Sequence, residues 1–551
     1  MAPAPSNVAY SLYLVTDSTS AILGDRDLVE VVQAAVEGGV TLVQYRDKVS
    51  DTAGLVSTAK RLHAVTQKHK IPLLINDRID VALAVGCEGV HIGQDDLGMC
   101  HGSQPTRSSS DLCLDLPSAR KLLGGDAIIG VTVSTVEEAQ KACKDGADYL
   151  GVGTMFATAT LAKVIASKTN TKGIIGTAGT KKILQAIAET GRNVRTVSIG
   201  GINASTVQRV LFQSSHPKKK LDGVAIVSAI IAAQDPKQAA KELLSLVKSP
   251  PPFAAASLAN DQKAANIETL LERTPAIIKE VGSKTPLSHN MTNLVVQNFA
   301  ANVALAVGGS PIMANYGEEA KDLCKLGGAL VINMGTVTPE GLQNYALALK
   351  AYNLEGGPVV LDPVGGGATA IRRGAVKTLL AAGYFDVIKG NEGEIKTVFG
   401  TVVQQKGVDS GASTLSDLEK ATLVRDLAAR ERNVVVMTGA TDFVSDGQRT
   451  YAVKNGHELL GRITGSGCVL GTTISLMLAV CRQDKLLAAV AGLLHYEIAA
   501  EIAAEREDVK GPGTFVPALI DELYDVQKAT SGGDISWLKR AKVEQVDIHD
   551  S

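Results

Sequence analysis

The sequence has few aromatic residues and no excess of charge of either sign. Phe, Trp and Tyr make up 4% of the 551 residues, and 55 Lys and Arg residues nearly balance 57 Asp and Glu residues, for a formal net charge of −2. A balanced charge argues against a chain that coats nucleic acid or an anionic membrane surface. Any recognition of phosphate groups must therefore depend on local clusters of residues.

Cysteine pairs and long apolar runs are missing as well. The seven cysteines are an odd number and include no Cys-x-x-Cys pair, which argues against a disulfide framework and against a cysteine zinc site. No uncharged apolar run reaches the roughly 18 residues of a membrane span, and residues 1–9 lack the pattern of a signal peptide. We therefore expect a soluble, cytoplasmic protein that binds neither nucleic acid nor membrane.

A run of three prolines divides the chain, which at 551 residues is too long for one core. Pro250, Pro251 and Pro252 close a helical run at 237–248, because proline cannot extend a helix. The Ala-rich stretch that follows has no core pattern until periodicity resumes near Ile267. A proline-rich loop within one domain is the alternative, and it is disfavoured because the catalytic signals differ on the two sides. We predict a domain at 1–248, a Pro/Ala-rich linker at 249–265 and a second domain at 266–551.

The first domain alternates short apolar runs with amphipathic segments of helix length, which is typical of βα units around a parallel sheet. Eight such units predict a TIM (β/α)8 barrel, whose chemistry lies at the carboxyl ends of the strands. The expected strands are 11–16, 41–46, 73–76, 89–92, 128–133, 149–153, 196–200 and 223–227.

Charged and amide side chains gather at the expected ends of strands two, three and four. Two cations there suit an anionic substrate, and aspartates beside an amide supply the oxygen ligands that Mg²⁺ prefers. Helix capping is the alternative role for each aspartate, and the neighbouring cations favour the metal site. The residues are Gln44, Arg46, Lys48, Asn76, Asp77 and Asp96.

Small residues end strands seven and eight, as Gly200-Gly201 and Val227-Ser228. Backbone N–H groups in these two loops, next to a helix N-terminus, are the usual phosphate site of a TIM barrel. We therefore expect a phosphate group to bind there.

These motifs, with His91-Ile92-Gly93-Gln94-Asp95-Asp96, Gly130-Val131-Thr132 and Phe156-Ala157-Thr158, resemble thiamin phosphate synthase. The resemblance implies that hydroxymethylpyrimidine diphosphate, after losing its diphosphate, is joined to hydroxyethylthiazole phosphate. No proton abstraction is obligatory, so His91 is expected to be neutral. The implied roles are Mg²⁺ binding for Asp77 and Asp96, diphosphate binding for Arg46 and Lys48, thiazole phosphate binding for Gly201 and Ser228, and further substrate contacts for Gln44, Asn76, Thr132, Thr158, Thr160, Lys168 and Val227.

Two segments, 98–115 and 161–167, interrupt the family pattern on catalytic loops. The family has a lysine directly after the position of Thr160, and here Lys168 is the better candidate and Lys163 the alternative. Extra loop length is thermodynamically cheap but can misplace a ligand. Retained introns in the gene model are our hypothesis for both segments, and sequencing the mature messenger RNA tests it.

The second domain has the pattern of a larger, layered α/β fold. It has no Walker lysine motif, which excludes a P-loop kinase. The expected strands lie near 311–313, 329–333, 359–362, 387–389 and 434–438.

A glycine-rich stretch, Thr464-Gly465-Ser466-Gly467-Cys468, precedes an apolar helix expected at 469–480. Its backbone N–H groups and the helix dipole suit an anion such as a γ-phosphate. Cys468 falls in the first turn, where the pKa of a thiol tends to drop from about 8.5 and a nearby hydroxyl could share its proton. A buried, inert cysteine is the alternative, and the preceding Gly-Ser-Gly favours the catalytic role.

An acidic pair, Asp362 and Glu394, lies at two strand ends, with Asn391 three residues before Glu394. Two carboxylates near phosphates can organise Mg²⁺. A turn cap before Pro363 is the alternative role for Asp362. Thr438, at another strand end, would support a nucleotide.

These stretches, with His289-Asn290-Met291-Thr292-Asn293, resemble hydroxyethylthiazole kinase, a branch of the ribokinase-like α/β/α fold. The resemblance implies MgATP-dependent phosphorylation of the thiazole alcohol, and an oligomer built on kinase-domain trimers with sites between subunits. A lysine, Lys389, stands where the family has arginine, which removes a bidentate contact. The implied roles are thiazole binding for Asn290, Met313 and Gly465, nucleotide binding for Lys389, Asn391 and Thr438, Mg²⁺ binding for Asp362 and Glu394, and a place beside the reacting hydroxyl for Cys468.

Together the two halves predict a bifunctional enzyme of thiamine biosynthesis, in which the second domain makes the thiazole phosphate that the first consumes. The alternative is a regulatory or assembly protein with an active kinase and a barrel disabled by its insertions. A barrel that acts as a phosphosugar epimerase or isomerase is disfavoured by the cations and carboxylates at its expected mouth.

Overall fold

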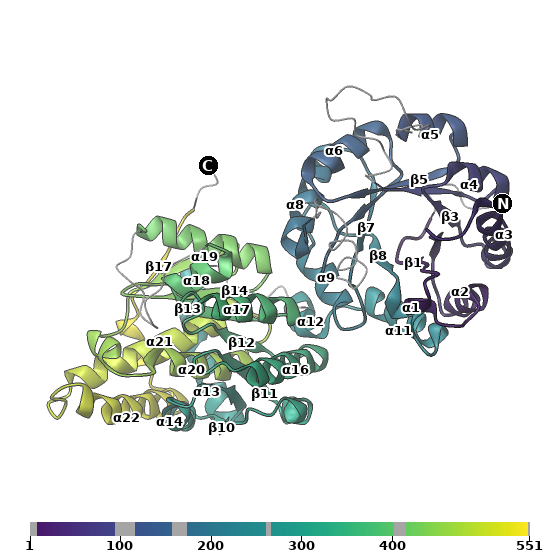
Figure 1. Cartoon of the computed structure of the whole chain (residues 1–551). Coiled ribbons are helices and arrows are strands. Elements are labelled where there is room, and N and C mark those ends of the chain that lie inside the picture. The colour runs from purple at the N-terminus through teal and green to yellow at the C-terminus, as the bar shows by residue number, and fades with distance from the viewer. Residues whose placement is uncertain (1–7, 94–115, 157–172, 260–265, 402–414, 549–551) are drawn as a thin grey trace. The chain divides into compact units, whose positions relative to one another are not determined.

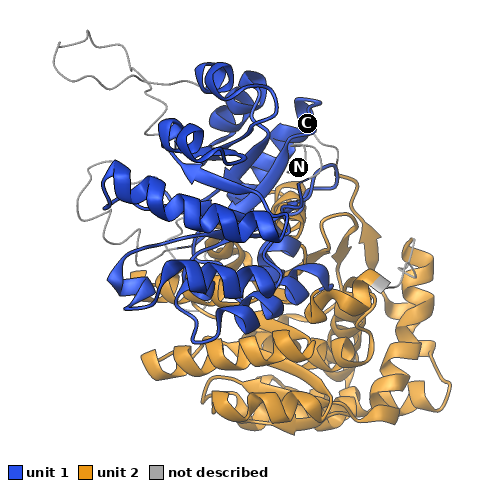
Figure 2. Cartoon of the chain, turned by 90° about the vertical axis from the view of Figure 1, so that its right-hand side faces the viewer, with its two compact units in different colours: residues 1–250 blue, residues 251–551 orange. Residues whose placement is uncertain are grey.

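The computed structural model describes residues 8–93, 116–156, 173–259, 266–401 and 415–548. The chain forms two compact units, Met1–Pro250 and Pro251–Ser551, which are coloured separately in Figure 2. Five candidate substrate or metal ligands, Asp96, Thr158, Thr160, Lys163 and Lys168, lie outside the described residues, as do both interrupting segments.

The first unit is a closed barrel of eight parallel strands in sequence order (Figure 1), which confirms the predicted TIM barrel. Each expected strand is present within a residue or two of its expected bounds. The strands are β1 Leu12–Val15, β2 Leu42–Tyr45, β3 Leu73–Asn76, β4 Gly89–Ile92, β5 Ile128–Val133, β6 Tyr149–Val152, β7 Arg195–Ile199 and β8 Gly223–Ile226.

Helices surround the barrel, and their apolar faces pack on the outside of the strands. Polar side chains begin several of them: the Asp27 carboxylate accepts the N–H groups of Val29 and Glu30 at the start of α2. The helices are α1 Ser20–Leu23, α2 Leu28–Glu37, α3 Thr52–Lys68, α4 Ile79–Val85, α5 Leu116–Leu123, α6 Val136–Asp145, α8 Gly176–Glu189, α9 Val207–Gln213, α10 Ser228–Ile231 and α11 Pro236–Lys248.

The second unit has one nine-stranded sheet in the order β10-β9-β11-β12-β13-β14-β15-β16-β17. Strands β9 to β14 pair in parallel, and β15 to β17 continue the sheet in antiparallel fashion. All five expected strands are present. The strands are β9 Leu287–Met291, β10 Ser310–Ile312, β11 Gly328–Asn333, β12 Val359–Asp362, β13 Val387–Asn391, β14 Val434–Thr438, β15 Asp442–Ser445, β16 Thr450–Val453 and β17 Val543–Gln545.

Two separate hydrophobic cores lie on the two faces of this sheet, so the unit is a three-layer α/β/α sandwich, as predicted. Helices α13 Ile267–Lys284, α14 Gln297–Val307, α20 Ser466–Val480, α21 Lys485–Glu505 and α22 Pro512–Ser531 belong to one core. Helices α15 Ala320–Lys325, α16 Pro339–Glu355, α17 Ala370–Ala382, α18 Glu392–Phe399 and α19 Asp417–Glu431 belong to the other.

Helix α21 is long and apolar enough to cross a membrane, and it is the one such helix among the described residues. Its most apolar window is 94% buried inside the unit. Burial in the sandwich core accounts for its composition.

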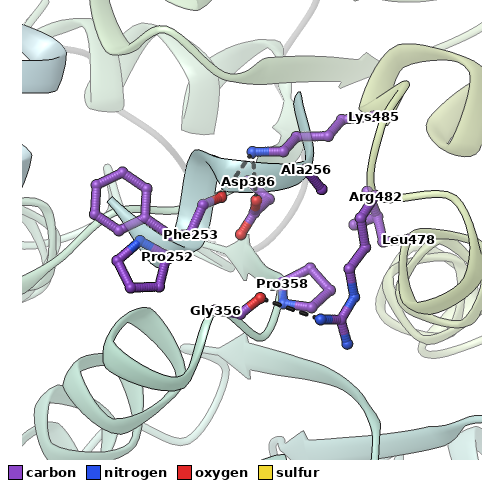
Figure 3. A pocket seen from close by; sticks show the side chains of 9 residues that line it. All are labelled: Pro252, Phe253, Ala256, Gly356, Pro358, Asp386, Leu478, Arg482 and Lys485. Atoms are coloured by element: carbon purple, nitrogen blue, oxygen red, sulfur yellow. Dashed lines mark hydrogen bonds and ion pairs between the residues drawn. The ribbon is translucent and has the colours of Figure 1, made fainter. Parts of the chain in front are cut away.

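The predicted linker differs from the structure in its second part, because Pro252–Ala259 form a helix, α12, that packs on the second unit (Figure 3). The Phe253 ring stacks on Tyr384 with 4.5 Å between centroids. The Lys485 ammonium lies 2.6 Å from the Asp386 carboxylate and donates to the Phe253 carbonyl at 3.3 Å. A short helix with a single polar residue, Ser257, has no periodicity to recognise, whereas proline fits the first helical turn.

Candidate active sites

A chain of hydrogen bonds crosses the inside of the barrel. Gln44 Nε2 donates to the Tyr13 hydroxyl at 2.9 Å, and the Tyr13 and Tyr149 hydroxyls lie 2.7 Å apart. His91 joins the chain, with Nδ1 2.7 Å from the Tyr149 hydroxyl and Nε2 2.8 Å from Thr132 Oγ1. The predicted residues Gln44 and Thr132 are therefore connected through Tyr13, Tyr149 and His91, and no sequence motif marks the two tyrosines.

This chain is buried and uncharged. Burial lowers the pKa of His91 to about 4 and raises the pKa of Tyr149 well above its usual value. His91 is therefore neutral at neutral pH, in agreement with the expectation from the sequence. The arrangement offers a fixed polar wall that can orient a ring substrate without exchanging a proton with it.

Charged residues lie at the mouth, where β2 and β3 end. Lys48 Nζ is 3.6 Å from Asp77 Oδ2, and the side chains are 56% and 19% exposed. Asn76 Nδ2 also donates to Asp77 Oδ2, and the Gly93 N–H group donates to Asp77 Oδ1 at 3.1 Å. Arg46, two residues before Lys48 in the sequence, is half-buried. The described residues thus supply one carboxylate of the expected Mg²⁺ pair, next to a cation.

The two expected phosphate loops follow β7 and β8, which are neighbours in the barrel. Gly200 and Gly201 both have positive φ, 105° and 67°, and a Cβ at Gly200 would meet Thr154 Cγ2 at 2.5 Å. Gly201 and Ser228 are exposed, and Val227 precedes the first turn of α10. Glycine is required at this turn by both conformation and space.

In the second unit, a buried polar network joins the ends of four elements. Lys389 Nζ lies 3.4 Å from Asp362 Oδ2, which also accepts from Asn333 Nδ2 at 2.9 Å. Asn293 Nδ2 donates to Asn333 Oδ1 at 3.0 Å and lies 3.5 Å from Cys468 Sγ. Asn333 was missed in the sequence, although an asparagine at the end of an apolar strand is a usable signal.

The second carboxylate of the expected pair is held by backbone groups. Glu394 accepts from the Gly365 N–H group through Oε1 and from the Asn391 N–H group through Oε2, both at 2.8 Å. Burial and the neighbouring Asp362 raise its pKa to about 7. Asp362 Oδ1 is buried and has no hydrogen-bond partner among the described residues. An unpaired carboxylate oxygen beside a second carboxylate fits a hard cation such as Mg²⁺.

The glycine-rich turn begins α20 and faces Lys389. Gly465 has a φ of 87°, and a Cβ at this residue would meet Val296 Cγ1 at 2.3 Å. A Cβ at Gly467 would lie 3.6 Å from Lys389 Nζ. A helix N-terminus and an ammonium group therefore meet at one point, which suits a phosphate. Burial opposes the charge of Lys389, but Asp362 and its neighbours outweigh this effect and raise its pKa.

The expected drop in the pKa of Cys468 is wrong. Burial, followed by the charge of Asp362, raises the pKa of this thiol to about 11 despite its place in the first turn of α20. Desolvation disfavours the thiolate more than the helix N-terminus favours it. Cys468 is therefore a neutral thiol at neutral pH.

Asn290, expected to bind the thiazole, is held by hydrogen bonds within β9 and to α20. Its amide group donates to the Ser288 carbonyl at 3.0 Å and to Ser288 Oγ at 2.9 Å, and accepts from Thr472 Oγ1 at 2.8 Å. The side chain is 1% exposed and connects β9 to α20. Met313 follows β10 and is half-buried, and Thr438 is half-buried and pairs in register with Asn391.

The family comparisons agree with the two folds. The model of the Hydroxyethylthiazole kinase family matches residues 278–529, and that of Thiamine monophosphate synthase matches residues 12–230. The chain is 43% identical to the "Probable thiamine biosynthetic bifunctional enzyme" of Schizosaccharomyces pombe, over 98% of this chain and 99% of that protein. This chain belongs to the family of thiamine biosynthetic bifunctional enzymes.

Two further proteins are similar to this chain. The "Thiamine biosynthetic bifunctional enzyme" of Saccharomyces cerevisiae is 37% identical over 94% of this chain and 96% of that protein. The solved hydroxyethylthiazole kinase of Pyrococcus horikoshii is 37% identical, covers 51% of this chain and 100% of its own, and has a TM-score of 0.44. The barrel is the thiamine phosphate synthase unit and the sandwich is the hydroxyethylthiazole kinase unit, both transferases, and the kinase family implies ATP as phosphoryl donor.

Proposed function

We propose that the kinase unit transfers phosphate from ATP to hydroxyethylthiazole, and that the synthase unit couples the product with hydroxymethylpyrimidine diphosphate to give thiamin phosphate and pyrophosphate. The observation that carries the first reaction is the meeting of Lys389, Asp362 and the glycine-rich start of α20. These groups combine positive charge, a carboxylate and free backbone N–H groups, as phosphoryl transfer requires.

In the kinase reaction, Lys389 and the N-terminus of α20 hold the terminal phosphate of ATP, while Asn391 and Thr438 lie beside the nucleotide. Asp362 and Glu394 hold Mg²⁺, which neutralises charge on the phosphates when bound. The neutral Cys468 thiol, fixed by Asn293, lies beside the reacting hydroxyl group and orients it. Met313 and Gly465 border the thiazole. Asn290 contributes indirectly, since its own hydrogen bonds position β9.

In the synthase reaction, Arg46 and Lys48 attract the diphosphate. Asp77 and Asp96 would hold Mg²⁺, which would supply further positive charge to the diphosphate. The neutral wall of Gln44, His91 and Thr132 orients the pyrimidine. Gly201 and Ser228 bind the thiazole phosphate through their exposed loops. The remaining proposed substrate contacts are Asn76, Thr158, Thr160, Lys168 and Val227.

A coupled assay tests the whole proposal on the purified full chain. With both ring precursors, ATP and Mg²⁺, we expect thiamin phosphate, and each half-reaction should proceed when its own substrates are supplied. ATP consumption without thiamin phosphate would favour the alternative of an active kinase with a disabled barrel. Omission of Mg²⁺ with added chelator should stop both half-reactions.

We propose a revised domain division, in which the barrel ends at residue 248, residues 249–251 form the join and the kinase unit begins with α12. Support comes from the stacking of Phe253 on Tyr384. Lys485, which pairs with Asp386, also donates to the Phe253 carbonyl (Figure 3). A fragment that starts at Pro251 should retain kinase activity and unfold at a higher temperature than one that starts at residue 266. Equal stability of the two fragments would restore the original boundary.

We further propose a cytoplasmic homo-oligomer built on trimers of the kinase unit. Apolar side chains stand exposed beside the kinase site: Leu294 is 69%, Val295 71% and Ile371 84% exposed. The Leu294 N–H group donates to Thr336 Oγ1, and Arg372, next to Ile371, donates to the Gly335 carbonyl. Leu294 and Ile371 therefore lie near the same turn, which follows β11. Light scattering of the parent and of Leu294→Asp/Ile371→Asp should show a trimer that dissociates.

A further inference from the structure

A second pair of acidic side chains lies buried in the kinase unit, apart from Asp362 and Glu394. Asp442 begins β15 and Glu497 lies in the middle of α21, and the residues are 6% and 5% exposed. Their carboxyl groups hydrogen-bond to each other. Two carboxyl groups can do so only when one of them carries a proton.

The surroundings show which group carries the proton. Asp442 Oδ1 accepts the Gly439 N–H group at 2.8 Å, which favours a carboxylate. Glu497 Oε2 is buried without a hydrogen-bond partner among the described residues, and a lone buried oxygen disfavours a charge. Burial raises the pKa of both groups, and the charge of Asp442 adds to this effect at Glu497, whose pKa lies well above its usual value. Glu497 is therefore the neutral donor and Asp442 the charged acceptor.

The loop at Asn455 and Gly456 packs beside the pair. A Cβ at Gly456 would lie 3.8 Å from Glu497 Cγ, so the backbone there packs over the Glu497 side chain. One turn further along α21, Glu501 accepts from the Gly456 N–H group and from Asn455 Nδ2, both at 3.1 Å. Glu497 thus packs beside a loop that Glu501, on the same helix, holds in place.

The pair also reaches the kinase site. Asp442 closes the turn between β14 and β15 through Gly439, directly after Thr438. Thr438 pairs in register with Asn391, whose N–H group binds Glu394. The ammonium of Lys389 acts electrostatically on Asp442. A shift of this turn would therefore move Thr438 relative to the groups proposed to bind ATP.

We propose that Glu497 is a positioning residue for ATP: through Asp442 it fixes the turn that presents Thr438 to the nucleotide, and it has no contact with the thiazole. This inference rests on the proposed kinase function.

The test uses three full-length variants and separate KM values for ATP and hydroxyethylthiazole. Glu497→Met removes the hydrogen bond and leaves Asp442 with one partner fewer, so KM for ATP should rise about tenfold, while KM for the thiazole stays within about twofold of the parent. Glu497→Gln keeps an N–H donor towards Asp442 and should restore both values. Leu523→Ala, a core change on α22, should lower the unfolding temperature without changing either KM.

Each outcome has a defined meaning. A parent chain without ATP-dependent phosphorylation would overturn the proposed function itself. If the parent is active, three outcomes would overturn the positioning role alone. They are a parallel rise of both KM values in Glu497→Met, no rise of either KM value in that variant, and no recovery of the KM for ATP in Glu497→Gln. If Glu497→Met fails to fold, Asp442→Asn provides the test. This variant retains an acceptor for the Gly439 N–H group and a hydrogen bond to Glu497, so its KM for ATP should stay within about twofold of the parent. A larger rise would refute the positioning role.

Discussion

Each unit places one Lys–Asp pair at the carboxyl end of parallel strands, with almost the same separation and very different burial. Lys48 and Asp77 lie 3.6 Å apart with 56% and 19% of the side chains exposed, whereas Lys389 and Asp362 lie 3.4 Å apart with 3% and 1% exposed. An exposed pair contributes about 0–1 kcal/mol to stability. A buried pair becomes strongly destabilising when one partner is removed. The kinase site is therefore tied to folding, and the barrel mouth is not.

The largest expected effect belongs to Asp362→Ala. It should remove kinase activity, and it should lower the free energy of unfolding of the kinase unit by about 3–5 kcal/mol because Lys389 loses its buried partner. Urea unfolding followed by the fluorescence of Trp537, the single tryptophan of the chain, measures this unit alone.

A double variant provides the control. Asp362→Ala/Lys389→Met removes both charges and should regain most of the stability but none of the activity. If Asp362→Ala proved as stable as the parent, the pair would behave like the exposed one and the contrast between the units would fail.

Asp77→Ala should abolish coupling and spare the kinase, and the loss of its pair with the exposed Lys48 should contribute no more than about 1 kcal/mol to any change in stability. Separate assays of the two half-reactions measure this difference. Asp77 has a φ of 62°, a conformation that asparagine tolerates and alanine resists. Asp77→Asn therefore keeps the backbone and removes the charge, and it should lose coupling as well. Equal loss of both activities would refute the separation of the sites.

Cys468→Ala should slow phosphoryl transfer by about 10- to 100-fold without unfolding the chain, because a positioned side chain is lost from the reacting group. Cys468→Ser should recover part of the rate, since the thiol is already neutral in the parent. Single-turnover phosphorylation of hydroxyethylthiazole measures the step. Unchanged turnover in the alanine variant would assign Cys468 a structural role.

The smallest effect concerns pH and the barrel. The pKa of His91 is about 4 in the folded chain and about 6.5 in the unfolded chain. As the pH falls, the unfolded chain therefore binds the proton first, and the folded state loses stability. Between pH 7 and pH 5 this loss amounts to about 2 kcal/mol. Urea unfolding followed by circular dichroism should show it, and His91→Asn should reduce it.

The same measurement separates the units. His495, buried in the kinase unit, also has its pKa lowered to about 4 by burial, so Trp537 fluorescence should keep its own pH dependence in His91→Asn. A pH dependence that disappeared from both signals would mean that the two units do not unfold independently.

Apolar periodicity made most of the fold predictable. The eight barrel strands and five sandwich strands follow from short apolar runs, and their polar ends marked Asp77, Asp362 and Glu394. Strand β9 was missed because Ser288, His289 and Asn290 are polar, and they are buried only through hydrogen bonds to α20 and other elements. The helix α12 was missed because eight residues that pack on Tyr384 and Lys485 have no pattern of their own.

The sequence by itself determined two domains, their folds, and the strand ends at which charged residues gather, because these depend on local pattern and on family motifs. The tertiary structure decided which polar groups are partners and how far each is removed from water. Asn293 and Cys468 are 175 positions apart and in contact, and the pKa of Cys468 rises where its position in a helix predicts a fall. Burial and long-range pairing set these properties, and both arise only when distant segments pack together.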